Sequence, residues 1–168
     1  MFREARRTDF DAIMALYRQL HPHDPPVTDG SGRATFEQIL DTGWLQLCVL
    51  ELDGTVIATT YLNLIPNITR SARPYAVIEN VVVDAERRGR GYGKMIMAHT
   101  LQRAWDAGCY KAMLMTGSRR ESTHGFYRAC GFSADDKTGY TARPPGWSAE
   151  HGSTPRSLKD DPPKDLPT

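Results

Sequence analysis

A turn rich in glycine and arginine carries the clearest chemical signal in the sequence. Gly89, Gly91 and Gly93 alternate with other residues, directly after an apolar stretch and directly before a run with helical periodicity. Glycine lets a backbone approach a ligand closely, and the first N–H groups of a helix have no partner within the helix. Such a turn binds phosphates. The residues available for this contact are Arg88, Gly89, Arg90, Gly91, Tyr92, Gly93 and Lys94.

The spacing of the turn excludes two common nucleotide-binding loops. A dinucleotide fingerprint requires G-x-G-x-x-G, but Lys94 stands where the third glycine is needed. A P-loop requires Ser or Thr after Gly-Lys and a glycine five residues before the second glycine, and these places hold Met95 and Arg88. The turn therefore predicts a phosphate-bearing ligand of another type.

The elements that position this turn form one mixed α/β pattern. An apolar stretch over residues 75–83 predicts a strand before the turn, and periodicity over residues 93–107 predicts a helix after it. The Asp53-Gly54 dipeptide predicts a hairpin between strands at 45–52 and 55–64. The other predicted elements are strands at 2–5, at 111–116 and after 132 through 137–142, and helices at 8–20, 35–41 and 122–130. This order predicts one sheet with helices on its faces.

The composition is that of an ordinary globular domain. The chain has 168 residues, 40% hydrophobic and 24% charged, and its formal net charge of +1 argues against a general binder of nucleic acids or membranes. No apolar run reaches the length of about 18 residues that a membrane span needs, and the N-terminus lacks the apolar core of a signal peptide. Three widely spaced cysteines without a C-x-x-C pair indicate reduced thiols of the cytoplasm and no metal site.

The last part of the chain differs in composition from the rest. Residues 143–168 hold six of the eleven prolines and few apolar residues. This composition is typical of a disordered tail, and packing on the same domain or on a partner is the alternative. We therefore expect one domain over residues 1–142 and a proline-rich tail over 143–168.

Two motifs together resemble the GNAT superfamily of N-acetyltransferases. The R-x-x-G-x-G pattern at residues 88–93 is similar to the acetyl-CoA signature of that family, and the F-Y-x-x-x-G-F pattern at 126–132 resembles the motif on its fourth helix. The resemblance covers residues 1–142 and is strongest over 76–132. It implies the GNAT fold, with a mixed, mostly antiparallel sheet of about six to seven strands and about four helices on its faces.

The resemblance also implies how acetyl-CoA is held. The pyrophosphate would lie on backbone N–H groups of residues 88–94, and a bulged strand at Val81, Val82 and Val83 would offer main-chain groups to the pantetheine. Many relatives carry an asparagine seven or four residues before the motif tyrosine, and this sequence has Arg120 and Thr123 there. The hydroxyl of Thr123 would keep one of the hydrogen bonds that the asparagine makes to the cofactor in those relatives.

Two residues are the catalytic candidates. By resemblance, Tyr127 donates a proton to the departing CoA thiolate, and Glu79 acts as a base or orients a water for the amine. A structural carboxylate is the alternative for Glu79. Regular alternation predicts that Glu79, Val81 and Val83 share one face of their strand. Weaker candidates for acid–base work are His99 and His124.

The resemblance places the acceptor amine among the loops at residues 21–33, 65–74 and 117–122. An arginine-rich rim there would suit an acceptor with a phosphate or carboxylate, and solvated loop charge is the alternative. The arginines concerned are Arg33, Arg70, Arg73, Arg119 and Arg120. Residues 78–83, 108–111 and 126–132 are similar to the glucosamine-6-phosphate N-acetyltransferase branch.

The sequence thus predicts a small-molecule N-acetyltransferase that uses acetyl-CoA and no metal. A protein or peptide acetyltransferase is one alternative, although no acidic cluster supports it. A non-catalytic acetyl-CoA sensor is the other, although Tyr127 argues against it. No nucleic-acid or membrane partner is expected, and a homodimer stays open because many relatives dimerise.

Overall fold

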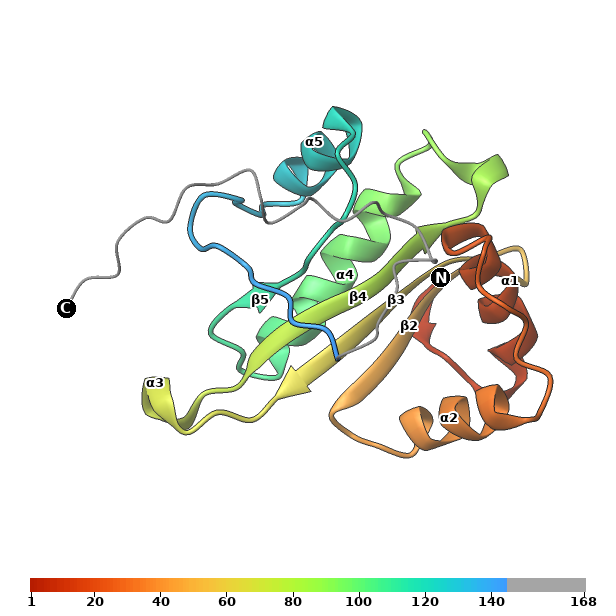
Figure 1. Ribbon diagram of the computed structural model, residues 1–168, viewed down its shortest axis with the longest axis horizontal. Helices are drawn as coiled ribbons and strands as arrows, with labels where there is room; N and C mark the ends of the chain where they lie inside the picture. The colour runs from red at the N-terminus through yellow and green to blue at the C-terminus, as the bar shows by residue number, and fades with distance from the viewer. Residues whose placement is uncertain (145–168) are drawn as a thin grey trace.

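One sheet lies between two layers of helices (Figure 1). The computed structural model describes residues 1–144, with α1 and α2 on one face of the sheet and α4 on the other. In chain order the elements are β1 (Phe2–Glu4), α1 (Phe10–Leu20), α2 (Ser31–Leu40), β2 (Leu45–Leu52), β3 (Thr55–Ile65), α3 (Thr69–Ala72), β4 (Tyr75–Val83), α4 (Tyr92–Asp106), β5 (Ala112–Met113) and α5 (Glu121–Ala129).

The five strands follow one another in the order β1-β2-β3-β4-β5. All neighbours are antiparallel except β4 and β5, which are parallel because α4 crosses between them. The predicted hairpin is confirmed, with Asp53 at φ 50° and Gly54 at φ 77°. Two positive φ angles in a two-residue connection suit the right-handed twist of the flanking strands.

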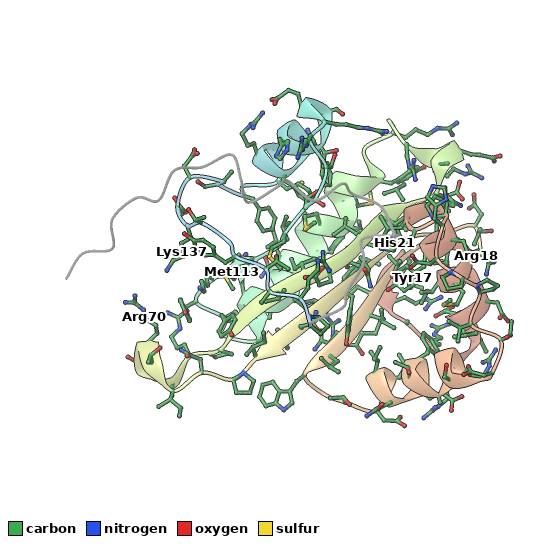
Figure 2. All side chains as sticks on the ribbon, viewed as in Figure 1. Tyr17, Arg18, His21, Arg70, Met113 and Lys137 are labelled. Carbon is green, nitrogen blue, oxygen red and sulfur yellow. The ribbon has the colours of Figure 1, made fainter. Side chains whose placement is uncertain are left out.

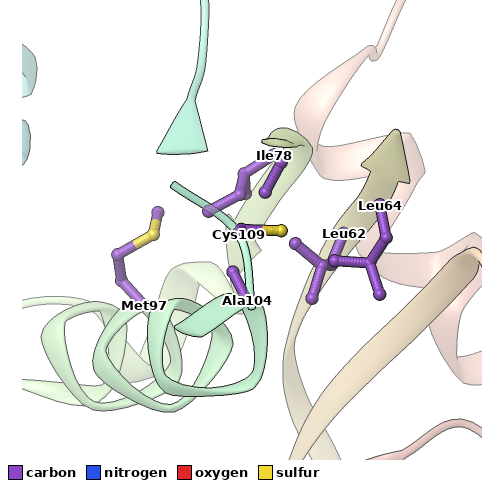
Figure 3. Close-up of a cluster of buried hydrophobic side chains, with 7 residues drawn as sticks. Leu62, Leu64, Ile78, Met97, Ala104 and Cys109 are labelled. Carbon is purple, nitrogen blue, oxygen red and sulfur yellow. The ribbon is translucent and has the colours of Figure 1, made fainter. Parts of the chain in front are cut away.

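The largest group of buried apolar side chains joins β3, β4 and α4. Figure 3 shows Leu62 and Leu64 of β3 and Ile78 of β4 meeting Met97 and Ala104 of α4. Met97 and Ile78 are almost completely buried, at 0% and 1% exposure. This packing fixes α4 against the strand that precedes it, and so fixes the connection between them.

A buried pair of hydroxyl groups also holds α4 to the sheet. The hydroxyl oxygens of Thr60 and Thr100 lie 2.7 Å apart in the interior, and Thr100 Oγ1 donates to the carbonyl of Ile96 at 2.8 Å. Both threonines are fully buried. Each hydroxyl therefore has a partner, as burial requires.

The predicted mixed α/β class is confirmed, but the predicted strand count is too high. β5 has two residues instead of the expected 111–116, and no strand forms at 137–142 or elsewhere after α5 in the described residues. Of the expected tail, residues 145–168 lie outside the described residues, so its boundary stays a prediction. Within residues 1–144, no helix combines the length and the apolar character that a membrane crossing needs.

Candidate active site

Strand β4 carries a β-bulge where it passes Thr60 of β3. Tyr61 pairs with Glu79 and Thr59 with Val82, so two steps along β3 correspond to three along β4. Asn80 accommodates the additional residue with a φ of 50°. Asparagine is among the few residue types that adopt this left-handed conformation readily. The bulge expected next to residues 81–83 is therefore confirmed.

The bulge changes which side chains of β4 share a face. Glu79 lies opposite Tyr61, which packs with the α1 and α2 side of the sheet. Val81 and Val83 pack into the two clusters on the α4 side. One inserted residue shifts the alternation by one position. The prediction that Glu79 shares a face with Val81 and Val83 is therefore wrong.

Strands β4 and β5 pair over a short distance only. Their pairing is confined to residues 76–77 and 112–113, whereas β4 continues to Val83. Beyond residue 77, the edge of β4 toward β5 has no strand partner within the described residues. Val81 and Tyr127 pack on the same core cluster beside this edge. An unpaired strand edge offers main-chain N–H and C=O groups to an extended ligand.

The connection from β4 to α4 leaves a run of backbone N–H groups free. We call residues 89–94 the glycine loop. None of its N–H groups donates to a backbone or side-chain acceptor within residues 1–144, and the next one, of Met95, donates to Gly91 at 3.0 Å. Gly89 and Gly91 have φ angles of 75° and 84°, so glycine is needed at both. Free main-chain N–H groups at the start of a helix are donors of the kind that an anion accepts from.

Side chains around the glycine loop hold it in place. Arg88 Nε donates to the carbonyl of Val83 at 3.0 Å, so this guanidinium fastens the turn to the end of β4. Gln19 of α1 donates to Asp84 at 2.9 Å and accepts from the N–H of Ala85 at 2.8 Å. The loop is thus anchored from the strand and from α1, which limits its motion when a ligand binds.

Tyr127 stands on α5 among aromatic rings. Its ring centroid lies 5.1 Å from that of Phe126 and 6.2 Å from that of Phe132. Burial raises the pKa of the Tyr127 hydroxyl above its usual value, and the charges of Cys130 and Glu79 add to the rise. The hydroxyl is therefore protonated at neutral pH and available as a proton donor.

Glu79 is half-buried next to the bulge. Its carboxylate accepts no hydrogen bond and forms no ion pair among residues 1–144. The charge of Glu79 adds to the rise in the pKa of Tyr127, although Glu79 lies on the α1 and α2 side of the sheet and Tyr127 packs on the α4 side.

Comparison with known proteins identifies the family. The sequence profile of the Acetyltransferase (GNAT) family matches residues 10–132. The chain belongs to this family. Glucosamine 6-phosphate N-acetyltransferase 1 of Oryza sativa subsp. japonica is 34% identical over 123 residues, which are 71% of this chain and 72% of the rice protein.

Solved structures give the same GNAT assignment. A protein of Agrobacterium tumefaciens str. C58, assigned as an acetyltransferase, is 42% identical with a TM-score of 0.81, over 86% of this chain and 99% of that one. Glucosamine-6-phosphate N-acetyltransferase from Arabidopsis thaliana is 27% identical with a TM-score of 0.73, over 85% and 96%. The predicted fold class and the predicted enzyme class, an N-acetyltransferase, are confirmed.

Other predicted residues of this GNAT chain have different surroundings. The hydroxyl of Thr123 accepts from Ser118 at 3.1 Å, so it is already engaged within the approach to α5. His99 is exposed and stacks on Phe2 of β1 at 4.7 Å, which gives it a packing role. His124 is half-buried in the first turn of α5, and its N–H donates to the carbonyl of Arg120 at 3.3 Å. No contact assigns acid–base work to either histidine.

Sequence reasoning missed Tyr17 and Asn80. Tyr17 lies within the helix predicted at residues 8–20, and its hydroxyl is enclosed without a hydrogen bond among the described residues. Burial raises the pKa of Tyr17 to about 12, while the nearby Asn80 and Thr59 side chains oppose the rise. The bulge thus has a tyrosine hydroxyl beneath it. The position of Asn80 at the bulge follows from the register of β4 against β3, and a local sequence pattern does not contain that register.

Proposed function

We propose that this protein transfers the acetyl group of acetyl-CoA to a primary amine of a small molecule, by direct attack in a ternary complex. The observation that carries the proposal is the run of free N–H groups in the glycine loop next to the unpaired edge of β4. The first suits a pyrophosphate, and the second suits the amide groups of pantetheine. Both features fit one extended ligand.

The coenzyme would lie along the strand from the glycine loop toward the bulge. Backbone N–H groups of residues 89–94 would hold the pyrophosphate, and main-chain groups of residues 81–83 would pair with the pantetheine. Lys94 is exposed on the first turn of α4 and adds positive charge there. In this arrangement the thioester arrives near Tyr127 and Glu79.

The chemistry needs one proton removed and one proton supplied. The neutral amine attacks the thioester carbonyl carbon, the C–N bond forms, and the C–S bond breaks with its electron pair on sulfur. Glu79, directly or through a water, takes the proton that the amine nitrogen loses. Tyr127 gives its proton to the thiolate. Burial raises the pKa of Tyr127 above its usual value, so its hydroxyl holds the proton until the thiolate leaves, and the proton transfer is less favourable than from a free tyrosine.

The acceptor class rests on the relatives and on the basic loops. Relatives of this chain are named glucosamine 6-phosphate N-acetyltransferases. Glucosamine 6-phosphate is therefore the first acceptor to test, followed by polyamines, amino acids and aminoglycosides. The tyrosine beside the open strand edge favours an enzyme over a non-catalytic acetyl-CoA sensor.

Two measurements test the proposal. Acetyl-CoA should raise the melting temperature, by an amount equivalent to about 2.7 kcal/mol at a hundredfold excess over Kd. An acceptor panel with free-thiol detection should then give CoA release that depends on the amine. No thermal shift with saturating acetyl-CoA would contradict the proposed cosubstrate, whereas a shift without thiol release for any amine would support the sensor.

Glu79→Gln tests the proposed base. The variant should lower kcat/KM and flatten the basic rise of the pH–rate profile, because no carboxylate is left to accept the proton of the amine. Glu86→Gln is the matched control, since Glu86 is exposed in the same connection and precedes the glycine loop. An unchanged pH profile in Glu79→Gln would assign Glu79 to structure.

A further inference from the structure

A hollow of about 600 Å³ lies at the start of β4, away from the glycine loop. Figure 2 shows Arg70 and Lys137 toward one end of the sheet and Tyr17 toward the other. The hollow is formed by the connection before β4, the residues before β5 and the segment after α5. Its lining residues are Arg70, Ser71, Arg73, Tyr110, Lys111 and Lys137.

The hollow concentrates positive charge. It holds four cationic side chains, although the whole chain has a formal net charge of +1. None of the four lies within 4.0 Å of a carboxylate in residues 1–144, not even Lys137, which directly follows Asp135 and Asp136. Four cations around one hollow repel one another, and an anion placed among them removes that repulsion.

Two of the cations have local contacts that position them. Arg73 donates to the carbonyl oxygens of Gly108 and Cys109 at 3.3 and 3.5 Å, so it fastens the wall of the hollow. The Lys111 ammonium lies 5.3 Å from the ring centroid of Tyr75 and 5.6 Å from that of Tyr110. Such ring contacts orient a lysine but leave its N–H donors available.

The turn that carries Arg70 has an unusual backbone. Arg70, Ser71 and Ala72 have φ angles of 59°, 60° and 57°, so α3 is a left-handed turn. Consecutive left-handed residues other than glycine are costly and persist where the surroundings hold them, often at ligand-binding sites. Here the Asn67 amide donates to the carbonyls of Thr69 and Arg73 at 2.6 and 3.4 Å. The turn is thus held so that Arg70 lines the hollow.

The position of the hollow excludes the phosphates of the coenzyme. Residues 75 and 83 are the ends of β4, which places the glycine loop about 26 Å away at 3.3 Å per residue. Glu79 is much nearer to the hollow than the glycine loop is. Lys111 accepts from the N–H of Ala76 at 2.9 Å, and Glu79 lies three residues farther along β4, or about 10 Å. The side chain of Lys111 is long enough to bridge part of the distance between the hollow and Glu79.

We propose that this hollow is the anion subsite of the acceptor, and that Arg70, Lys111 and Lys137 bind a phosphate monoester at the far end of the molecule from its amine. A phosphate monoester carries nearly two negative charges at neutral pH and three acceptor oxygens, which match several cations better than one carboxylate does. The inference rests on the proposed function in one respect, because it assumes that the amine reacts near Glu79.

Phosphate binding is measured first, without turnover. With saturating CoA present to occupy the glycine loop, inorganic phosphate should raise the melting temperature relative to chloride at equal ionic strength. Arg70→Asn and Lys137→Gln should each lose most of that shift. Asparagine tolerates the left-handed conformation of position 70, and Lys137 is exposed, so both variants should fold. Arg6→Gln, an exposed position following β1 at the opposite edge of the sheet, is the control and should keep the shift.

Turnover supplies the second readout. In Arg70→Asn and Lys137→Gln, KM for glucosamine 6-phosphate should rise about tenfold, as expected for a lost charge-assisted contact, while KM for glucosamine and for acetyl-CoA stays near the wild-type value. A phosphate shift that survives in both variants would overturn the proposal, as would equal changes in KM for the two sugars. If acetyl-CoA gives no shift in the wild type, the proposed function fails, and the phosphate measurement still decides the hollow.

Discussion

The ring of Phe126 lies directly over Gly93. A Cβ atom built on Gly93 would stand 3.1 Å from Cε2 and 3.4 Å from Cζ of that ring, closer than ordinary van der Waals contact. Gly93 belongs to the glycine loop and Phe126 to α5, so this contact joins the two motifs found in the sequence. The φ of Gly93 is not in the left-handed range, so the backbone conformation does not require glycine here. The requirement comes from the Phe126 ring, which leaves no room for a Cβ atom.

Gly93→Ala should therefore push α5 away from the start of α4. We expect a loss of about 1–3 kcal/mol in the free energy of unfolding, partly offset by the better helix propensity of alanine. Affinity for acetyl-CoA should fall as well, because the donors of the loop move with α4. Urea unfolding and the KM for acetyl-CoA measure the two effects.

Gly125→Ala is the matched control for this variant. Gly125 is also helical and adjoins Phe126, but nothing lies within 4 Å of a Cβ placed on it. Alanine there should leave stability unchanged or raise it by up to about 1 kcal/mol. Equal losses in the two variants would contradict the steric role of Gly93.

Tyr127→Phe should lower kcat by about a hundredfold or more, since a positioned acid contributes a factor of this order. KM for acetyl-CoA should change little, because the ring keeps its contacts with Phe126 and Phe132. Steady-state kinetics at several pH values measure both. Tyr140→Phe, at a residue that is 90% exposed, is the control. An unchanged kcat in Tyr127→Phe would remove this residue from the chemistry.

Local patterns predicted the parts of the site that lie within one segment. The glycine loop and the hairpin at residues 53–54 follow from turn chemistry that neighbouring residues determine. The face of Glu79 could not be predicted in this way. It depends on the bulge at Asn80, and the bulge is set by the register against Thr60 on another strand.

Tertiary assembly also explains two other features that the sequence did not predict correctly, the hollow and the end of the sheet after α5. Arg70, Lys111 and Lys137 belong to three separate segments, and no local signal indicates that they line one hollow. The expected strand at residues 137–142 rested on its place after α5, but strands form only where a neighbour offers a free edge in register. β5 is two residues long, which leaves little edge for another strand to pair with.

The buried threonine pair predicts unequal effects of two similar substitutions. Thr100 donates to the carbonyl of Ile96, so the hydroxyl of Thr60 must donate to Thr100. Thr100→Val leaves the Thr60 donor without that acceptor and should cost about 1–3 kcal/mol, whereas Thr60→Val removes only a donor and should cost about 1 kcal/mol.

The double variant Thr60→Val with Thr100→Val completes the cycle. It leaves neither hydroxyl unpaired, so it should lose less stability than the sum of the two single variants. Urea unfolding measures all four proteins. Additive losses would mean that the pair does not couple α4 to β3.

Arg3 forms ion pairs with Asp9 and Glu51 that should govern the stability of the protein in acid. The Arg3 guanidinium donates to both oxygens of Asp9, at 2.6 and 3.0 Å, and to Glu51 at 2.6 and 2.9 Å. Asp9 is 7% exposed and also accepts from the N–H of Arg6 at 2.6 Å. These donors, Arg3 first, hold the pKa of Asp9 below its usual value, although burial opposes them.

A folded-state pKa below the unfolded one means that the unfolded chain binds a proton more readily. The contribution of Asp9 is therefore complete above about pH 4 and is lost as the pH falls through the lower folded-state pKa. Asp9→Asn should cost about 1.5–3 kcal/mol at pH 7, the range for hydrogen bonds to charged groups, and the difference from wild type should shrink below pH 4. Urea midpoints between about pH 2.5 and 7 measure this. Asp41→Asn removes an exposed carboxylate paired with Arg7 and should show a much smaller difference at every pH. A gap between Asp9→Asn and wild type that stays constant into acid would show that the charge of Asp9 is not what stabilises the fold.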